Sequence, residues 1–324
     1  MSFLSEAITV ARRSLAASGK APKDAVERLK QCVRGKLATL ADERNLRICD
    51  KTEGGMLRGP KRSRLKRENK GAGNLHLLCQ EEYLHQSKLE VPYFRAVFNT
   101  NNHVLNIRRA ASEQAVRLLG YEAPLMRKCR KVTKTGVSGR EVACDLVGLE
   151  PGNRLLCIEG KVSARPDATD IVYGILESFA YGVCLQFVLE DGARRRQLRE
   201  EVKVCLNEFH PGEPVSAGAD LSAAYSLAAP AEYFREYVHP CRLSTEKARK
   251  RLDEAERLLN SLKTLRAPAW AGFLLLNAPC NEGEFATPRS HKTVDGVRCF
   301  EPFFKTDPLI ASVADDPAAL RAIL

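Results

Sequence analysis

Residues 140–162 read REVACDLVGLEPGNRLLCIEGKV, and this stretch decides the predicted fold. Two runs rich in apolar residues flank a Pro-Gly-Asn triplet, which is typical of a tight turn between two antiparallel strands. Ionisable residues interrupt both runs: Asp145 the first, and Glu159 and Lys161 the second. Burying an unpaired charge costs several kcal/mol. Charges inside otherwise apolar strands therefore indicate a functional site.

The spacing of these charges predicts that they share one face of the hairpin. Glu159 and Lys161 are two positions apart, so their side chains point the same way. A register that sets residue 145 opposite residue 159 brings Asp145 beside them. Two carboxylates next to an ammonium are typical of a site for a hard metal ion with a neighbouring cation. The hairpin depends on that register, because a slip by one residue would move Asp145 to the other face.

Composition indicates a soluble globular protein with an anionic partner. The 324 residues are 44% hydrophobic and 28% charged, and the net charge is +11. A basic balance of this size favours nucleic acid as the partner, although a generally basic protein without such a partner is the alternative. The 11 cysteines show no CxxC spacing, which argues against a zinc ribbon and favours reduced thiols in the cytoplasm. The charged N-terminus is not typical of a signal peptide.

The order of predicted elements is that of an α/β protein. Helices are expected within residues 1–50, over 102–120 (the segment that carries Glu113), and over 171–181, 194–209, 231–238 and 245–265. Strands are expected at 125–140, in the hairpin, and at 183–190 and 269–277. The apolar segment 171–189 nearly suffices to span a membrane, but Gly182 is expected to divide it into a buried helix and a buried strand. The predicted fold is a mixed central sheet flanked by helices, without a membrane span.

Two basic segments are the predicted contacts for nucleic-acid phosphates. The first lies in a glycine-containing linker, and the second adjoins the hairpin. Solvated, mobile charge is the alternative interpretation of such runs, but phosphate contact would make binding sensitive to salt. The predicted nucleic-acid-binding residues are Lys61, Arg62, Arg64, Lys66 and Arg67 in the first segment and Arg127, Lys128, Arg130, Lys131, Lys134 and Arg140 in the second.

Asp145, Glu159, Gly160 and Lys161 form a D…(D/E)-x-K pattern that resembles the PD-(D/E)XK nuclease superfamily. Acid-x-Lys also occurs at 68–70 and 201–203, but only Glu159 lies in an apolar strand behind an acid-bearing partner strand. Cys144 stands where the family has Pro, and the Gln-x-x-x-Tyr signature of its exonuclease-like members is absent. The resemblance covers roughly residues 102–208 and implies a restriction-endonuclease-like core.

The resemblance also implies a domain organisation and a chemistry. Residues 1–75 would be a basic helical region and linker, either a DNA reader or a cap, and residues 76–324 a nuclease-like domain with an α/β extension from 209. Asp145, Glu159 and the Gly160 carbonyl would bind Mg²⁺ or Mn²⁺, which polarises the phosphate and lowers the pKa of water. Lys161 would stabilise developing charge. Glu113 would assist from the opening helix, and the site would be lined by Tyr173, Glu177 and Tyr181.

The expected function is a metal-dependent nuclease, a DNA endonuclease of restriction or defence type, acting as a homodimer where both strands are cut. The alternative is a non-catalytic nucleic-acid-binding or scaffold protein on a degenerate nuclease fold. A buried salt bridge without further function is the bland interpretation of the charged hairpin, but such pairs seldom gain stability over apolar packing. The enzyme hypothesis is therefore preferred.

Overall fold

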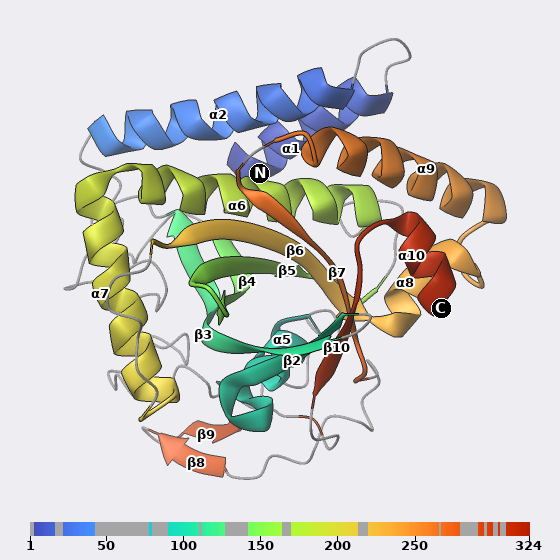
Figure 1. Ribbon diagram of the computed structural model, residues 1–324. Helices are drawn as coiled ribbons and strands as arrows, with labels where there is room; N and C mark the ends of the chain where they lie inside the picture. The colour runs from blue at the N-terminus through green and yellow to red at the C-terminus, as the bar shows by residue number, and fades with distance from the viewer. Residues whose placement is uncertain are drawn as a thin grey trace.

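A computed structural model describes residues 3–16, 22–42, 78–79, 90–109, 112–126, 142–163, 170–212, 220–265, 267–278, 291–294, 297–300, 304 and 309–324. The fold is built around one curved sheet with helices above it and at its sides (Figure 1). The linker cations 61–67 and the cations 127–140 lie outside the described residues, so their predicted contacts stay predictions.

Seven strands form a closed barrel. Their order around it is β10 (Ile310–Ala314), β2 (Val104–Arg109), β3 (Ser112–Met126), β4 (Val142–Glu150), β5 (Arg154–Gly160), β6 (Ser222–Pro230) and β7 (Ala269–Leu276). The last strand closes the barrel because β10 pairs in parallel with β2 and antiparallel with β7. The predicted open sheet of the restriction-endonuclease type is therefore wrong. A C-terminal segment of five residues joins the two edges that such a sheet would leave open.

The hairpin of β4 and β5 has the predicted strands, turn and register. Gly152 and Asn153 have positive φ angles of 82° and 62°, which glycine and asparagine tolerate best. The antiparallel ladder runs from Glu150–Arg154 to Leu146–Ile158, the register that brings residue 145 towards residue 159. The alternation of side chains in this register determines what each face of the hairpin contacts.

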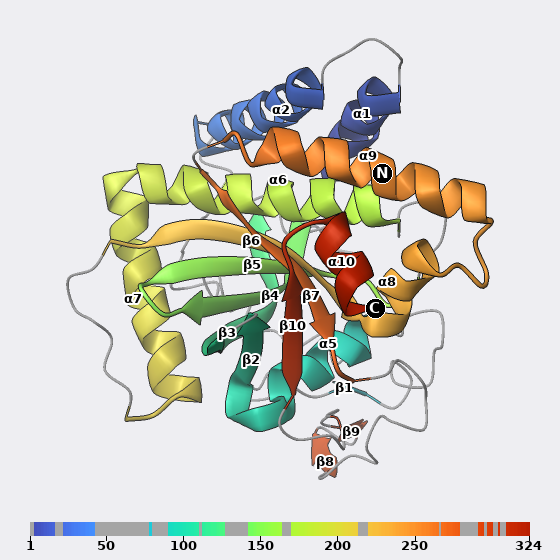
Figure 2. The same ribbon diagram turned by 45° about the vertical axis from the view of Figure 1, so that its right-hand side comes forward.

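The inner face of the barrel packs against helix α5 (Glu90–Asn99). Leu146 of β4 and Leu156 and Ile158 of β5 join Tyr93 and Phe94 of α5 in one buried hydrophobic cluster, to which all seven strands contribute. Alternate residues on these strands face the other way, as the strand period of two requires. Figure 2 shows α5 beside β2 and β10, on the opposite side of the sheet from the long helices.

The outer face is covered by helix α6 (Ile171–Glu190), a single 20-residue helix. The predicted change to a strand at Gly182 is wrong. A Cβ at Gly182 would lie 2.9 Å from the Tyr225 ring of β6, so this glycine permits a close approach between helix and sheet. Helix α6 is long and apolar enough to cross a membrane, but its most apolar window is 83% buried inside the protein. Burial of that extent is typical of a core helix.

Helices α1 (Phe3–Ala16), α2 (Pro22–Asp42) and α9 (Thr245–Leu262) lie over α6 (Figure 1). Ile8 and Leu29 are fully buried in the same cluster as α6. Asp170 caps α6 by accepting a hydrogen bond from the Tyr173 backbone N–H, and it pairs with Arg12 of α1 and Arg251 of α9. The described N-terminal helices therefore share their core with the barrel domain, as the cap alternative predicts.

The remaining elements complete the periphery. They are α7 (Gly192–Phe209), α8 (Ala231–Val238), α10 (Pro317–Ile323), the short turn η2 (Thr100–His103) and a small sheet of β1 (Leu78–Cys79), β9 (Val297–Phe300) and β8 (His291–Val294). The helices predicted at 194–209, 231–238 and 245–265 and the strand at 269–277 are confirmed in type. Residues 222–230, which read as a loop, form β6. Alanine-rich strands buried on both faces lack the polar alternation that marks a strand in sequence.

Candidate metal centre

Three carboxylates from three elements meet at one end of the β4–β5 hairpin. Oxygens of Glu90, Asp145 and Glu159 all lie within 4.8 Å of one another. Asp145 is fixed on β4 because its Oδ2 accepts a hydrogen bond of 2.7 Å from the Gly160 backbone N–H of β5. Glu159 is the second-last residue of β5, and Glu90 begins α5. The structure thus brings together the two acids that the sequence singles out and adds a third.

Lys161 lies beside this cluster, and its ammonium contacts two carboxylates, one inside the cluster and one outside it. Its Nζ donates to Glu159 Oε1 and, at 3.1 Å, to Glu177 Oε2 of α6. The side chains of Lys161 and Glu159 are each 5% exposed, and that of Glu177 is 17% exposed. Glu159 and Lys161 therefore point the same way, as their spacing predicts, and they point towards α6.

The electrostatics of the site are dominated by burial and by an excess of negative charge. Desolvation raises the pKa of Asp145 and of Glu159 well above the usual range, and neighbouring carboxylates raise both further. Burial likewise raises the pKa of Glu90. Desolvation alone would lower the pKa of Lys161, but the surrounding carboxylates outweigh it and keep the amine charged. One ammonium faces four acids, so the site favours an additional cation.

The third acid, Glu90, is the residue that sequence reasoning missed. The helix expected at 102–120 to carry an assisting acid is wrong, because residues 104–109 form β2 and residues 112–120 belong to β3. Leu105 and Ile107, and likewise Val116 and Leu118, are buried at every second position, which is the period of strands. The helix that faces the sheet is α5, where Glu90 precedes Pro92. An acid and a proline in the first turn are a helix-start signal that could have located it.

Glu113 lies outside the site, so its predicted catalytic role is not supported by its position. It stands on β3, its side chain is 43% exposed, and it pairs with Arg108 at 3.3 Å. Of the residues expected to line the site, Glu177 contacts Lys161. Burial raises the pKa of the Tyr181 hydroxyl well above its usual value, and the nearby charges of Glu177 and Glu159 raise it further. Tyr173 is buried in the cluster under α6.

Gly160 determines how closely α5 approaches β5. A Cβ at this position would lie 2.0 Å from Cε2 of the Phe94 ring, so the ring or the helix that carries it must shift. We expect Gly160→Ala to lower the free energy of unfolding by about 1–3 kcal/mol or more, as overpacked cores do. Urea denaturation measures this change.

The matched control for this substitution is Gly35→Ala on α2, where a new Cβ would meet nothing within 4 Å. Removing a helical glycine there should be neutral or stabilising by up to about 1 kcal/mol. Equal stability of Gly160→Ala and the wild type would show that α5 is not held against β5 at this point.

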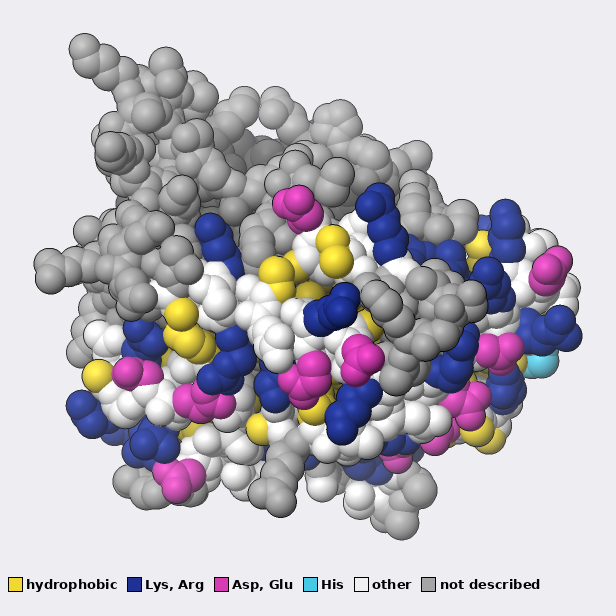
Figure 3. Space-filling view, turned by 90° about the horizontal axis from the view of Figure 1, so that it is seen from above, with side chains coloured by type: hydrophobic (Ala, Val, Ile, Leu, Met, Phe, Trp, Pro, Cys, Tyr) yellow, Lys and Arg dark blue, Asp and Glu magenta, His cyan; other side chains and the backbone are white. Residues whose placement is uncertain are grey.

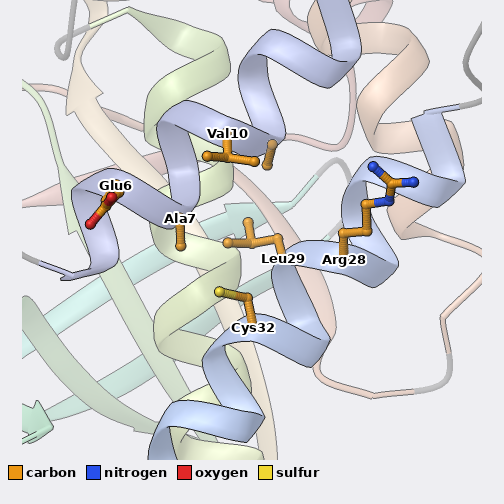
Figure 4. Close-up of a pocket in the computed structure, with 7 residues that line it drawn as sticks. Glu6, Ala7, Val10, Arg28, Leu29 and Cys32 are labelled. Carbon is orange, nitrogen blue, oxygen red and sulfur yellow. The ribbon is translucent and has the colours of Figure 1, made fainter.

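One pocket lined by described residues lies away from the carboxylates. It has a volume of about 240 Å³ and lies between α1 and α2, where it is lined by Glu6, Ala7, Val10, Ala11, Arg28, Leu29 and Cys32 (Figure 4). Its lining contains one acid, Glu6, and one thiol, Cys32, and no cluster of carboxylates. On the same upper side of the molecule, basic and acidic side chains are interspersed over α2 and α9 (Figure 3). Neither feature adds a catalytic group to the carboxylate cluster.

Comparisons with protein-family models, with curated proteins and with solved structures found no match for this chain. The family resemblance therefore rests on Asp145, Glu159 and Lys161 themselves. The class of site is defined by geometry alone: one buried and two partly buried carboxylates from a barrel hairpin and a helix, with an ammonium beside them.

Proposed function

We propose that this protein is a metal-dependent phosphodiesterase that acts on nucleic acid, with DNA as the expected substrate. The observation that carries the proposal is the convergence of the Glu90, Asp145 and Glu159 carboxylates beside the Lys161 ammonium. An ion-pair network that served stability alone would have no reason to hold four acids against one lysine, because the excess charge costs free energy.

The carboxylate cluster fits a small divalent cation. Mg²⁺ binds oxygen ligands at about 2.0–2.1 Å, so two oxygens on one ion are at most about 4.2 Å apart. The separations within the cluster, up to 4.8 Å, require side-chain shifts of less than about 1 Å to meet that condition. All three donors are hard carboxylate oxygens, which suit Mg²⁺ or Mn²⁺ better than a softer metal. The excess negative charge supplies the attraction.

Each residue then has a defined part. Glu90, Asp145 and Glu159 would hold the cation, which when bound polarises a phosphate and lowers the pKa of a nearby water. The Gly160 N–H fixes the orientation of the Asp145 carboxylate. Lys161 places a positive charge next to the same carboxylates, where it can stabilise the negative charge that develops on a phosphate. Because Lys161 is buried and stays protonated, it acts as a fixed charge rather than as a base.

Net charge supports a polyanionic substrate over a small phosphoester. The chain carries 51 Lys and Arg against 40 Asp and Glu, although its candidate site is itself acidic. The surplus of cations must therefore lie elsewhere in the chain, where it can attract a long phosphate backbone. The finer prediction of an endonuclease of restriction or defence type stays a prediction.

Cleavage assays test the proposal directly. Supercoiled plasmid, linear duplex, single-stranded DNA and RNA should be incubated with the protein in Mg²⁺, in Mn²⁺ and in chelator. We expect metal-dependent cleavage of at least one DNA substrate, with none in chelator. If Glu90→Gln leaves the same background cleavage as the wild type on every substrate, the proposal fails. Salt-sensitive binding without cleavage would favour the scaffold alternative.

A further inference from the structure

The Lys161 ammonium is divided between two elements of the fold. One carboxylate partner, Glu159, stands two positions earlier on β5, and the other, Glu177, comes from the middle of α6. An ammonium has three N–H donors, so both contacts can be made at once. The second contact, at 3.1 Å, is a hydrogen bond that joins Glu177 of α6 to the lysine at the end of the hairpin.

The carboxylate of Glu159 takes part in two interactions. It is one of the three acids whose oxygens lie within 4.8 Å of one another, and it is also a partner of Lys161. If Glu159 were the sole anionic partner of Lys161, the ammonium and a divalent cation would compete for it. Glu177 is not one of the three acids of that group, and it contacts the Lys161 ammonium from α6, a different element from the β5 strand that carries Glu159.

We infer that Glu177 is a positioning residue that draws the Lys161 ammonium towards α6 and so leaves Glu159 available to a divalent cation. This inference rests on the proposed function. It adds Glu177 as a fourth acid, which affects metal binding through its contact with Lys161 rather than as a ligand. The contact with Lys161 Nζ requires a carboxylate on a side chain as long as that of Glu at position 177. A shorter acid keeps the charge but withdraws it from Nζ.

Mn²⁺ binding to the full chain, measured by titration calorimetry without substrate, tests the inference. The informative variants are Glu177→Asp, Lys161→Met and their combination. We expect Glu177→Asp to weaken Mn²⁺ binding about tenfold when Lys161 is present, within the range for coupled contacts. In the Lys161→Met background the same change should alter the affinity less than about twofold. In cleavage assays, Glu177→Asp should lower kcat and leave the KM for DNA unchanged.

The outcomes separate this inference from the proposed function. Equal weakening in both backgrounds would make Glu177 a direct ligand or a structural residue, and no weakening in either would remove its role; both results overturn the inference. Glu113→Asp, the same change at an exposed acid, is the matched control. If Lys161→Met does not fold, wild-type affinity of Glu177→Asp overturns the inference alone. If the wild type binds no Mn²⁺, the proposed function fails as well.

Discussion

Asp145→Asn is expected to abolish cleavage and, at the same time, to make the metal-free protein more stable. The amide keeps an oxygen that can accept from the Gly160 N–H but loses the charge that would hold a cation. We expect kcat to fall by at least about 100-fold, the loss typical of removing one electrostatic group from a catalytic site. The free energy of unfolding should rise, because burial disfavours the charged form of the acid and the amide carries no charge.

The gain in stability should depend on pH in a defined direction. The pKa of Asp145 is raised in the folded state, chiefly by burial, so the folded protein favours the protonated acid. The cost of the buried charge is fully present above the folded pKa and disappears as the pH falls towards the ordinary value of about 4. The difference between Asp145→Asn and the wild type should therefore be largest at alkaline pH and shrink on acidification.

Denaturant unfolding of both proteins in chelator, at several pH values, measures this difference. Glu113→Gln is the control, because Glu113 is exposed and outside the cluster; it should change neither cleavage nor the pH profile. A less stable Asp145→Asn protein at every pH would show that the carboxylate cluster is not electrostatically strained. Added Mn²⁺ should stabilise the wild type and leave Asp145→Asn nearly unchanged.

Lys161→Met is expected to have the opposite effect on stability together with the same loss of cleavage. The lysine side chain is 5% exposed and pairs with Glu159 and Glu177. Removing one partner from a buried ionic cluster leaves uncompensated charge, which costs about 3–5 kcal/mol. Methionine has a similar length and fills the same space, so the loss measures charge rather than a cavity.

A second substitution separates the two roles of Lys161. The double variant Lys161→Met with Glu159→Gln should recover much of the lost stability, because it removes one of the uncompensated buried negative charges, but it should not recover cleavage. Thermal and denaturant unfolding give the first quantity and plasmid cleavage the second. Full stability of Lys161→Met in the absence of metal would mean that the four acids are already neutral without the lysine. Lys203, which pairs with Glu200 on the surface of α7, is the matched control.

The local sequence pattern was sufficient to predict the β4–β5 hairpin and the site residues that lie on it. A turn of Pro, Gly and Asn between apolar runs specifies both strands and their register, and the register in turn brings Asp145 towards Glu159 and sets Lys161 on the same face. These relations span fewer than 20 residues. Helix α9 was likewise predictable, since its apolar stripe has the helical period and Ser244 caps it by accepting from the Lys247 N–H.

Local pattern misled where it was short or ambiguous. The residues of β2 and β3 satisfied a helical stripe by chance, and the apolar second half of α6 read as a strand because buried helices and buried strands look alike in composition. Both errors concern elements whose identity is settled by what packs against them. Helix α6 continues through Gly182, which allows the helix to lie close to the Tyr225 ring of β6.

What the sequence determined by itself is the β4–β5 hairpin with Asp145, Glu159 and Lys161 on one face, because turn chemistry and the two-residue period of a strand act over short distances. The tertiary structure alone decided that the sheet closes, through β10, and that Glu90 of α5 joins the two acids of the hairpin. Those contacts join residues far apart in the chain. Their free energy comes from burying whole faces of elements against one another, which no stretch of sequence records.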